Sequence, residues 1–349
     1  MEVTVASATD SELGVDATPW TLLRGKASHL REILRPFIRV LRANPLTLIG
    51  FILVVIISTT ALLVAIVPVI SQVVLGHPVL LTPYDPNGIS TDYSQAPSLK
   101  HLLGTDKLGL DIFSRVLAAL PLDLAIGVGI AGFALLLGGG LGLVAGYWDK
   151  PRTLGGVISA VILRVTDVFL AFPSLVLALA IAASLGRGTG PSILAVLLTW
   201  WPYYVRLTRG EVLAVKHRPY VVAARAAGVS EVRILFRHVL RNLIEPLLVY
   251  YTLDIGTVII TFSTISFVGI GVPLDVSEWG TMVEAYEQLL LTHPWTVLAP
   301  GAAIFITVLA FSLFGDGLRD ILDPRSRRTL VQAVAATTLP GQVAGAAEA

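Results

Sequence analysis

The chain has 349 residues, of which 54% are hydrophobic and 14% are charged, and its mean hydropathy is +0.78. A soluble domain of this length would be about a quarter charged, so the composition excludes that class and indicates a polytopic membrane protein. The sequence has no cysteine, which excludes a disulfide framework, a thiolate metal site and a thiol nucleophile. The formal net charge is only +1, so the positions of the charges are more informative than their sum.

Residues 1–44 are predicted to be a cytoplasmic tail. They lack the basic-then-apolar layout of a signal peptide, so the apolar run that follows is expected to be retained. Six basic residues between Arg24 and Arg42, with apolar residues on the opposite helical face, predict an amphipathic helix along the membrane surface. Residues 45–70 carry no charge and form the first predicted transmembrane helix.

Residues 71–120 are predicted to form an external loop. The part up to residue 104 is rich in Pro, Gly, Asp and Ser, which favour turns over regular structure. Beyond it, apolar residues at helical spacing predict an interfacial helix that leads into the next span: Ile112, Phe113, Val116, Leu117 and Leu120.

A transmembrane core is predicted over residues 121–318. It contains five further spans, over 121–147, 157–184, 191–210, 244–271 and 295–315. Gly138, Gly142 and Gly146 recur every four residues in the first of these. This spacing predicts a stripe that lets a neighbouring helix approach closely.

The distribution of basic residues predicts the orientation. If the N-terminus is inside, 21 of the 25 Lys and Arg residues fall on the inner side of six spans. Both termini are then cytoplasmic, including a C-terminal tail over 319–349. The basic stretch between the fourth and fifth spans, centred on the loop 211–243, is placed in the cytoplasm as well.

Residues 211–246 form the most informative stretch. Pro219 suits the first turn of a helix, and Gly228 suits a left-handed stop just after its end. Ser230 is then expected to cap a second helix, with Glu231 in its first turn. That helix should bury one apolar stripe, formed by Val232, Leu235, Phe236, Val239 and Leu243, and expose Arg233, Arg237 and Arg241.

The segment from Tyr220 to Gly228, with His238 to Asn242, resembles the cytoplasmic "EAA" loop of importer-type ABC permeases. In that family the loop carries a coupling helix that docks on the ATP-hydrolysing subunit. The resemblance implies that the coupling residues are Tyr220, Ala223, Ala224, Arg225 and Gly228. Two positions differ from the motif of that family: Val222 stands in place of the usual glutamate, and Arg241 in place of the usual proline. Without the resemblance, a solvated surface helix pair explains the same pattern.

Three more stretches resemble the "C" type of dipeptide and oligopeptide permeases: Leu41 to Gly50, Tyr84 to Asn87 and Gly104 to Arg115. Leu110 stands where that group usually has arginine. The resemblance covers about residues 37–328. It implies an all-α fold of six transmembrane helices, the last five forming the type I ABC importer permease core.

The resemblance also implies a multi-subunit transporter and its cellular location. The chain would be a permease in the cytoplasmic membrane of a prokaryote, surrounded by lipid and without nucleic acid. It would pair with a second homologous permease, two ATP-binding subunits and an extracytoplasmic solute-binding protein. ATP and magnesium would be bound by the ATP-binding subunits, and this chain would hold no cofactor. The expected cargo is dipeptides or oligopeptides, while nickel, glutathione and oligosaccharides stay open.

Few residues are candidates for chemistry. The sequence contains no phosphate-binding G-x-x-x-x-G-K-[ST] loop and no H-E-x-x-H motif, so neither ATP hydrolysis nor a zinc site is expected. Arg164 and Asp167 are three residues apart and are expected to pair. Asp254, well inside the fifth span, has two interpretations: a contact with the translocation path or an interhelical hydrogen bond. A stand-alone secondary transporter or channel is the alternative class.

Overall fold

A computed structural model describes residue 41 and residues 44–322, so most of the predicted amphipathic segment and the tail beyond residue 322 lie outside it. Its helices are α2 (Pro45–Leu75), α3 (Ile112–Tyr147), α4 (Leu154–Leu170), α5 (Ser174–Leu185), α6 (Thr189–Val215), α7 (Pro219–Ala226), α8 (Glu231–Ile234), a π-helical turn (Leu235–Val239), α9 (Leu240–Phe267), α10 (Trp279–Tyr286), a 3-10 turn (Glu287–Leu289) and α11 (Trp295–Leu322). Within the described residues there is no β-strand, only an isolated bridge between Thr105 and Asp111. The all-α prediction is therefore confirmed.

Four helical stretches are long and apolar enough to cross a membrane: α2, α3, Glu231–Phe267 and α11. The pair α4 and α5 makes a fifth if it counts as one broken span. Helix α6 has 27 residues, but Trp, Tyr and Pro in its middle reduce its hydropathy, and it is not among these stretches. A membrane protein is confirmed, while the number of six spans stays a prediction.

The predicted third span, 157–184, is broken. Helices α4 and α5 meet at an angle of 83°, and Pro173 lies between them. Proline lacks a backbone N–H and disfavours the helical conformation of the residue before it, here Phe172. The sequence therefore contains the physical reason for the break, although a single apolar run was predicted.

The predicted interfacial helix and the span that it leads into form one continuous helix, and an interfacial position for its first part stays a prediction. Helix α3 begins at Ile112 and continues through Pro121 to Tyr147. The Asp111 side chain caps it by accepting a hydrogen bond of 2.8 Å from the Ser114 backbone N–H. Ile112 and Ala119 are fully buried, so this first part of α3 packs inside the protein.

Helices α3 and α6 are joined along the predicted glycine stripe. A Cβ atom on Gly138 would lie 2.2 Å from the Trp201 carbonyl oxygen, and one on Gly142 would lie 2.6 Å from that of Val205. Real Cβ atoms do not approach backbone so closely, so only glycine permits this contact. The predicted packing role of the stripe is confirmed, and α6 is its partner.

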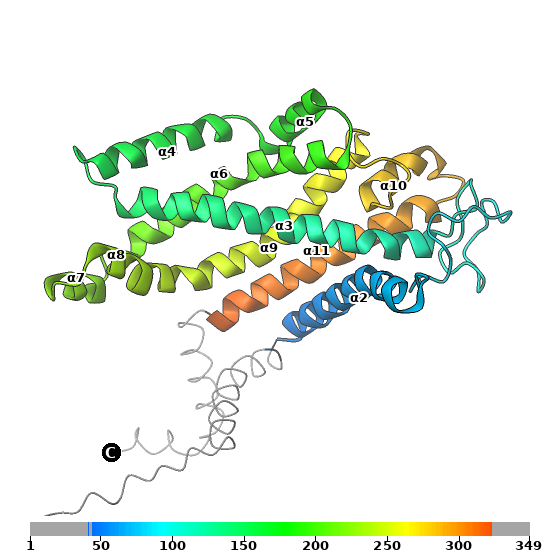
Figure 1. The fold of residues 1–349 in the computed structure, drawn as a ribbon, viewed down its shortest axis with the longest axis horizontal. Coiled ribbons are helices and arrows are strands. Elements are labelled where there is room, and N and C mark those ends of the chain that lie inside the picture. Colours follow the sequence, from blue (N-terminus) through cyan, green and yellow to red (C-terminus); the bar gives the residue numbers. More distant parts are fainter. Residues whose placement is uncertain (1–40, 42–43, 323–349) are drawn as a thin grey trace, which may run out of the picture.

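The bundle has two ends that are formed by different elements (Figure 1). Helices α7 and α8 form one end, and α10 with the loop between α2 and α3 forms the other. At the α10 end, the Glu278 side chain caps α10 by accepting hydrogen bonds of 2.9 Å from Gly280 N–H and 2.7 Å from Thr281 N–H. Glu278 is fully buried, so α10 is fixed at its first turn.

The loop before α3 is held to α10 by buried charge. Asp106 is 1% exposed, accepts a hydrogen bond from the Tyr286 hydroxyl, and lies 3.7 Å from an Arg115 nitrogen. His101, 2% exposed, bridges two carboxylates, at 2.9 Å from Asp111 and 3.2 Å from Asp92. These contacts give the predicted external loop a defined structure.

Candidate functional site

The predicted coupling residues lie in the segment between α6 and α9. Helix α6 ends at Val215, and the Lys216 ammonium donates a hydrogen bond of 2.9 Å to the Gly146 carbonyl oxygen near the end of α3. Arg209 donates one of 2.8 Å to Asp149, just beyond α3. The start of the segment is therefore tied to α3, which the sequence did not reveal because these partners are distant along the chain.

Helix α7 is short, and one residue anchors it. Pro219 occupies its first turn, as predicted. Val221 is fully buried in an apolar cluster with Ile234, Leu235 and Val239. Because the rest of the helix is largely uncovered, the cluster sets its position while most of its surface stays free.

The turn after α7 has a specific geometry. Gly228 has a φ of +77°, as predicted from its position. The Val229 N–H donates a hydrogen bond of 3.1 Å to the Ala224 carbonyl, and the Gly228 N–H donates one of 3.1 Å to the Arg225 carbonyl. This pair of bonds is the Schellman arrangement, which needs a left-handed residue after the helix. A Cβ atom added to Gly228 would have no neighbouring atom within 4 Å, so only the backbone conformation requires glycine there.

Glu231 has a larger role than the sequence suggested. Its carboxylate accepts two hydrogen bonds from Arg225, of 2.7 and 3.1 Å, and one from the Tyr147 hydroxyl at the end of α3. The carboxylate raises the pKa of the Arg225 guanidinium through these hydrogen bonds. Ser230 precedes α8, but its side chain makes no capping bond, so that part of the prediction is wrong. Glu231 instead links α7, α8 and α3.

The predicted apolar stripe on the second helix is partly wrong. Leu235, Val239 and Leu243 are buried, but Val232 and Phe236 are each 59% exposed. The π-helical turn Leu235–Val239 explains the difference, because it adds a residue to one turn and shifts the helical register. Ile234 takes the inner position, and Phe236 lies on the outer face.

The predicted coupling residues lie on the exposed side of this region. Tyr220 is 42% exposed, Ala223, Arg225 and Gly228 are exposed, and Ala224 is half-buried. A groove of about 350 Å³ runs beside Tyr220 and is lined by Tyr220, Arg237, His238, Arg241 and Asn242. The surface thus combines small residues, an aromatic ring and positive charge, which suits contact with an acidic partner surface.

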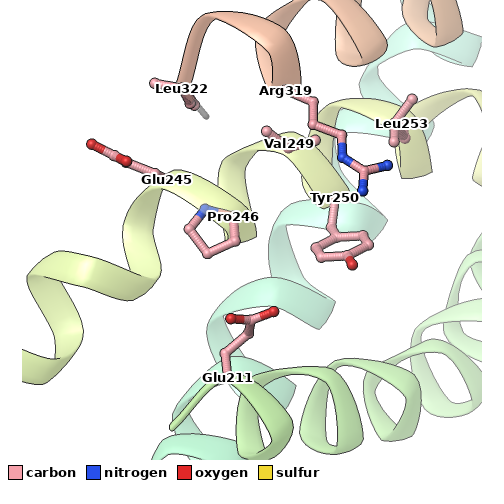
Figure 2. Close-up of a pocket in the computed structure, with 8 residues that line it drawn as sticks. All are labelled: Glu211, Glu245, Pro246, Val249, Tyr250, Leu253, Arg319 and Leu322. Atoms are coloured by element: carbon pink, nitrogen blue, oxygen red, sulfur yellow. The ribbon is translucent and has the colours of Figure 1, made fainter. Parts of the chain in front are cut away.

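A second pocket lies near the ends of α6 and α11 and the first half of α9, as Figure 2 shows. It measures about 290 Å³. Glu211, Glu245, Tyr250 and Arg319 share its lining with four apolar side chains: Pro246, Val249, Leu253 and Leu322. This pocket could not be predicted from the sequence because its charges come from three separate helices. The available sequence signal is that Glu211, Glu245 and Arg319 each lie near the end of a predicted span.

Asp254 makes interhelical hydrogen bonds. Its carboxylate accepts a hydrogen bond of 2.7 Å from the Trp200 indole N–H and one of 2.9 Å from the Tyr204 hydroxyl. Both donors lie on α6. This is the arrangement that the second interpretation of Asp254 expects, and a role in the translocation path stays a prediction. Asp167 pairs with Arg206 of α6 at 2.7 Å instead of with Arg164, because α4 lies beside α6.

The described residues contain no group of three or more His, Cys, Asp or Glu side chains that could hold a metal ion. In the segment between α6 and α9, the short helix α7 is anchored by Val221 and leaves most of its surface exposed.

Comparison with known proteins places the chain in a family. The family described as "binding-protein-dependent transport system inner membrane component" matches residues 138–328. A probable D,D-dipeptide transport system permease protein of Escherichia coli K12 is 40% identical over 247 residues, covering 70% of this chain and 81% of the relative. A dipeptide transport system permease protein of Alkalihalophilus pseudofirmus is 40% identical over 233 residues, covering 67% and 75%.

A glutathione transport system permease protein of Pectobacterium atrosepticum is 39% identical over 248 residues, covering 70% of this chain and 80% of the relative. The family match spans more than half of the chain and includes α6 to α11 and the segment between α6 and α9. The chain belongs to the family of inner membrane components of binding-protein-dependent transport systems.

Proposed function

We propose that this chain is a permease subunit of an ATP-driven ABC importer and forms half of a path for dipeptides or oligopeptides across the cytoplasmic membrane. Its relatives are named for dipeptide and glutathione transport, and glutathione is itself a short peptide. The observation that carries the proposal is the anchored, exposed α7. A stand-alone transporter or channel has no need of such a helix.

The proposed mechanism is alternating access. Two ATP-binding subunits hold ATP and magnesium, and their closure moves α7, while this chain binds no cofactor. Glu231 passes the movement to α3, because it contacts both Arg225 and Tyr147. A second homologous permease completes the path, and an external solute-binding protein delivers the cargo. ATP-driven closure therefore shifts the bundle between outward-open and inward-open states.

The partner at α7 can be identified with single cysteines, because the natural chain has none. Ala223→Cys lies on the exposed side of α7, and Thr292→Cys is an exposed control beyond α10. We expect a short thiol cross-linker to join Ala223→Cys to the ATP-binding subunit, and Thr292→Cys to give no such product. Equal cross-linking at both positions, or none at Ala223→Cys in a complex that hydrolyses ATP, would count against the docking proposal.

The proposed orientation places both termini and the loop 211–243 in the cytoplasm. A membrane-impermeant thiol reagent applied to intact cells should label Thr292→Cys and leave Arg225→Cys unlabelled until the membrane is opened. The reverse pattern would overturn the orientation, which rests on the distribution of Lys and Arg.

A further inference from the structure

Another cavity, separate from the groove and the pocket described above, lies at the end of the bundle opposite α7. It is enclosed by the α5–α6 turn, the segment between α9 and α10, and α10 itself. It measures about 540 Å³, which is within the range of small-molecule sites. Two hydrogen bonds join the turn before α6 to the segment after α9. The Gly188 N–H donates one of 3.3 Å to the Ile270 carbonyl, and the Arg187 side chain donates one of 2.5 Å to the Gly269 carbonyl. We call it the α10-end cavity; four polar or charged residues in its lining are Arg187, Ser266, Asp275 and Glu284.

One buried polar atom in this cavity has no partner. Ser266 is 2% exposed, and its hydroxyl forms no hydrogen bond with any described residue. A buried hydroxyl without a partner is unfavourable, so it is expected to be matched by a group that enters from outside. Because Ser266 also lines the cavity, an entering molecule can supply that match.

The charged side chains around the cavity are not paired with one another. Arg187, Asp275 and Glu284 form no ion pair with one another within the described residues, although all three line the same space. A Cβ on Gly269 would lie 2.9 Å from an Arg187 terminal nitrogen and 3.7 Å from a Glu284 oxygen. The Arg187 guanidinium and the Glu284 carboxylate therefore both lie near Gly269 in the wall of the cavity, and they form no ion pair with each other.

We infer that the α10-end cavity binds the charged termini of a small zwitterionic peptide. The Arg187 guanidinium can take a carboxylate through its two terminal nitrogens, and Glu284 with Asp275 can take an ammonium group. The Ser266 hydroxyl can bond to the peptide backbone. The inference rests on the import function proposed above and adds a peptide contact within the permease itself.

Protection of a single cysteine tests this inference directly. Leu274→Cys lines the cavity and position 274 is 63% exposed, so a thiol reagent should reach it. In the complex reconstituted with its partner subunits, we expect Ala-Ala to slow its modification by about tenfold, a difference of about 1.4 kcal/mol. N-acetyl-Ala-Ala-amide, which lacks both charges, should give no protection, and Thr292→Cys outside the cavity should be modified equally fast in every case.

Glu284→Gln supplies the second arm, because it keeps the side chain's size and removes only the charge. We expect it to abolish protection of Leu274→Cys by Ala-Ala, and to raise the KM for dipeptide import about tenfold while kcat stays within about twofold. Thr292→Ala should leave both parameters unchanged.

The outcomes separate the inference from the function on which it rests. If the wild-type complex imports Ala-Ala but the peptide does not protect Leu274→Cys, or the neutral peptide protects it equally, the inference is overturned and the importer stands. If the wild-type complex imports no peptide of any kind, the proposed function fails first. Zwitterion-selective protection that Glu284→Gln removes supports both.

Discussion

The two ends of the bundle use charge in opposite ways. At the α10 end, Arg115 and Asp106 face each other with side chains that are 6% and 0% exposed. At the α7 end, Arg225 and Glu231 form a two-bond pair with both side chains 42% exposed. A buried pair cannot exchange its partner for water, whereas an exposed pair can. The α10 end is therefore built for fixed geometry, and the α7 end for contact with another molecule.

The largest expected effect comes from breaking the buried pair. Arg115→Leu leaves Asp106 buried without its cation, and such losses cost about 3–5 kcal/mol. We expect a clear fall in the thermal unfolding temperature of the purified protein and a reduced amount in the membrane. Lys100→Leu is the matched control, because Lys100 pairs with Asp92 at the surface with 60% of its side chain exposed. Equal behaviour of the two variants would remove the contrast between the ends.

A second prediction concerns the contact between α3 and α6, two long helices that run between the ends. Gly138→Leu forces a side chain into the Trp201 backbone, and overpacking of this kind costs about 1–3 kcal/mol or more. Gly140→Leu, two residues along the same helix, has nothing within 4 Å of its Cβ. We expect Gly138→Leu to lower thermal stability and Gly140→Leu to leave it unchanged. A stable Gly138→Leu would show that α3 and α6 can separate without loss.

The third prediction concerns function more than stability. Gly228→Val places a β-branched residue at φ +77°, which costs on the order of 1–3 kcal/mol of local strain. We expect normal membrane levels, because Gly228 is exposed, but loss of transport and of substrate-stimulated ATP hydrolysis. Gly228→Asn should retain most activity, because asparagine tolerates the left-handed conformation. Wild-type transport by a well-expressed Gly228→Val complex would contradict a coupling role for α7.

The smallest effect is expected at the exposed pair. Glu231→Gln keeps the shape of the side chain, and a pair of this exposure contributes about 0.2–1 kcal/mol. We expect little change in the unfolding temperature but weaker coupling of ATP hydrolysis to transport, measured as the number of ATP molecules used per peptide. A loss of stability as large as that of Arg115→Leu would mean that the two ends are not different in kind.

Local rules predicted much of this structure. The left-handed Gly228, the Pro219 start of α7 and the glycine stripe of α3 each depend on a few neighbouring residues, and the sequence displays them. The exposure of Val232 and Phe236 could not be predicted, because a π-helical turn shifts the register without a signature in the spacing.

Contacts between distant segments were out of reach for a different reason. Arg164 is the nearest basic residue to Asp167 along one helix, but Asp167 faces Arg206 of another. In the same way, the α10-end cavity collects Arg187, Ser266 and Glu284 from three segments. Such pairings depend on how the helices pack against one another, and the spacing of residues along the sequence does not show which helices meet.

Helix α6 gives the glycine contact a mechanical consequence. It begins directly after Gly188, at the α10-end cavity, and ends directly before Lys216, which donates a hydrogen bond to the end of α3. Its 27 residues span about 40 Å at 1.5 Å per residue. Backbone contact with α3 makes the two helices one stiff rod, and a tilt of roughly 5° about one end displaces the other by roughly 3.5 Å. The rod is a lever whose arm is the length of α6, from the α10-end cavity to Lys216.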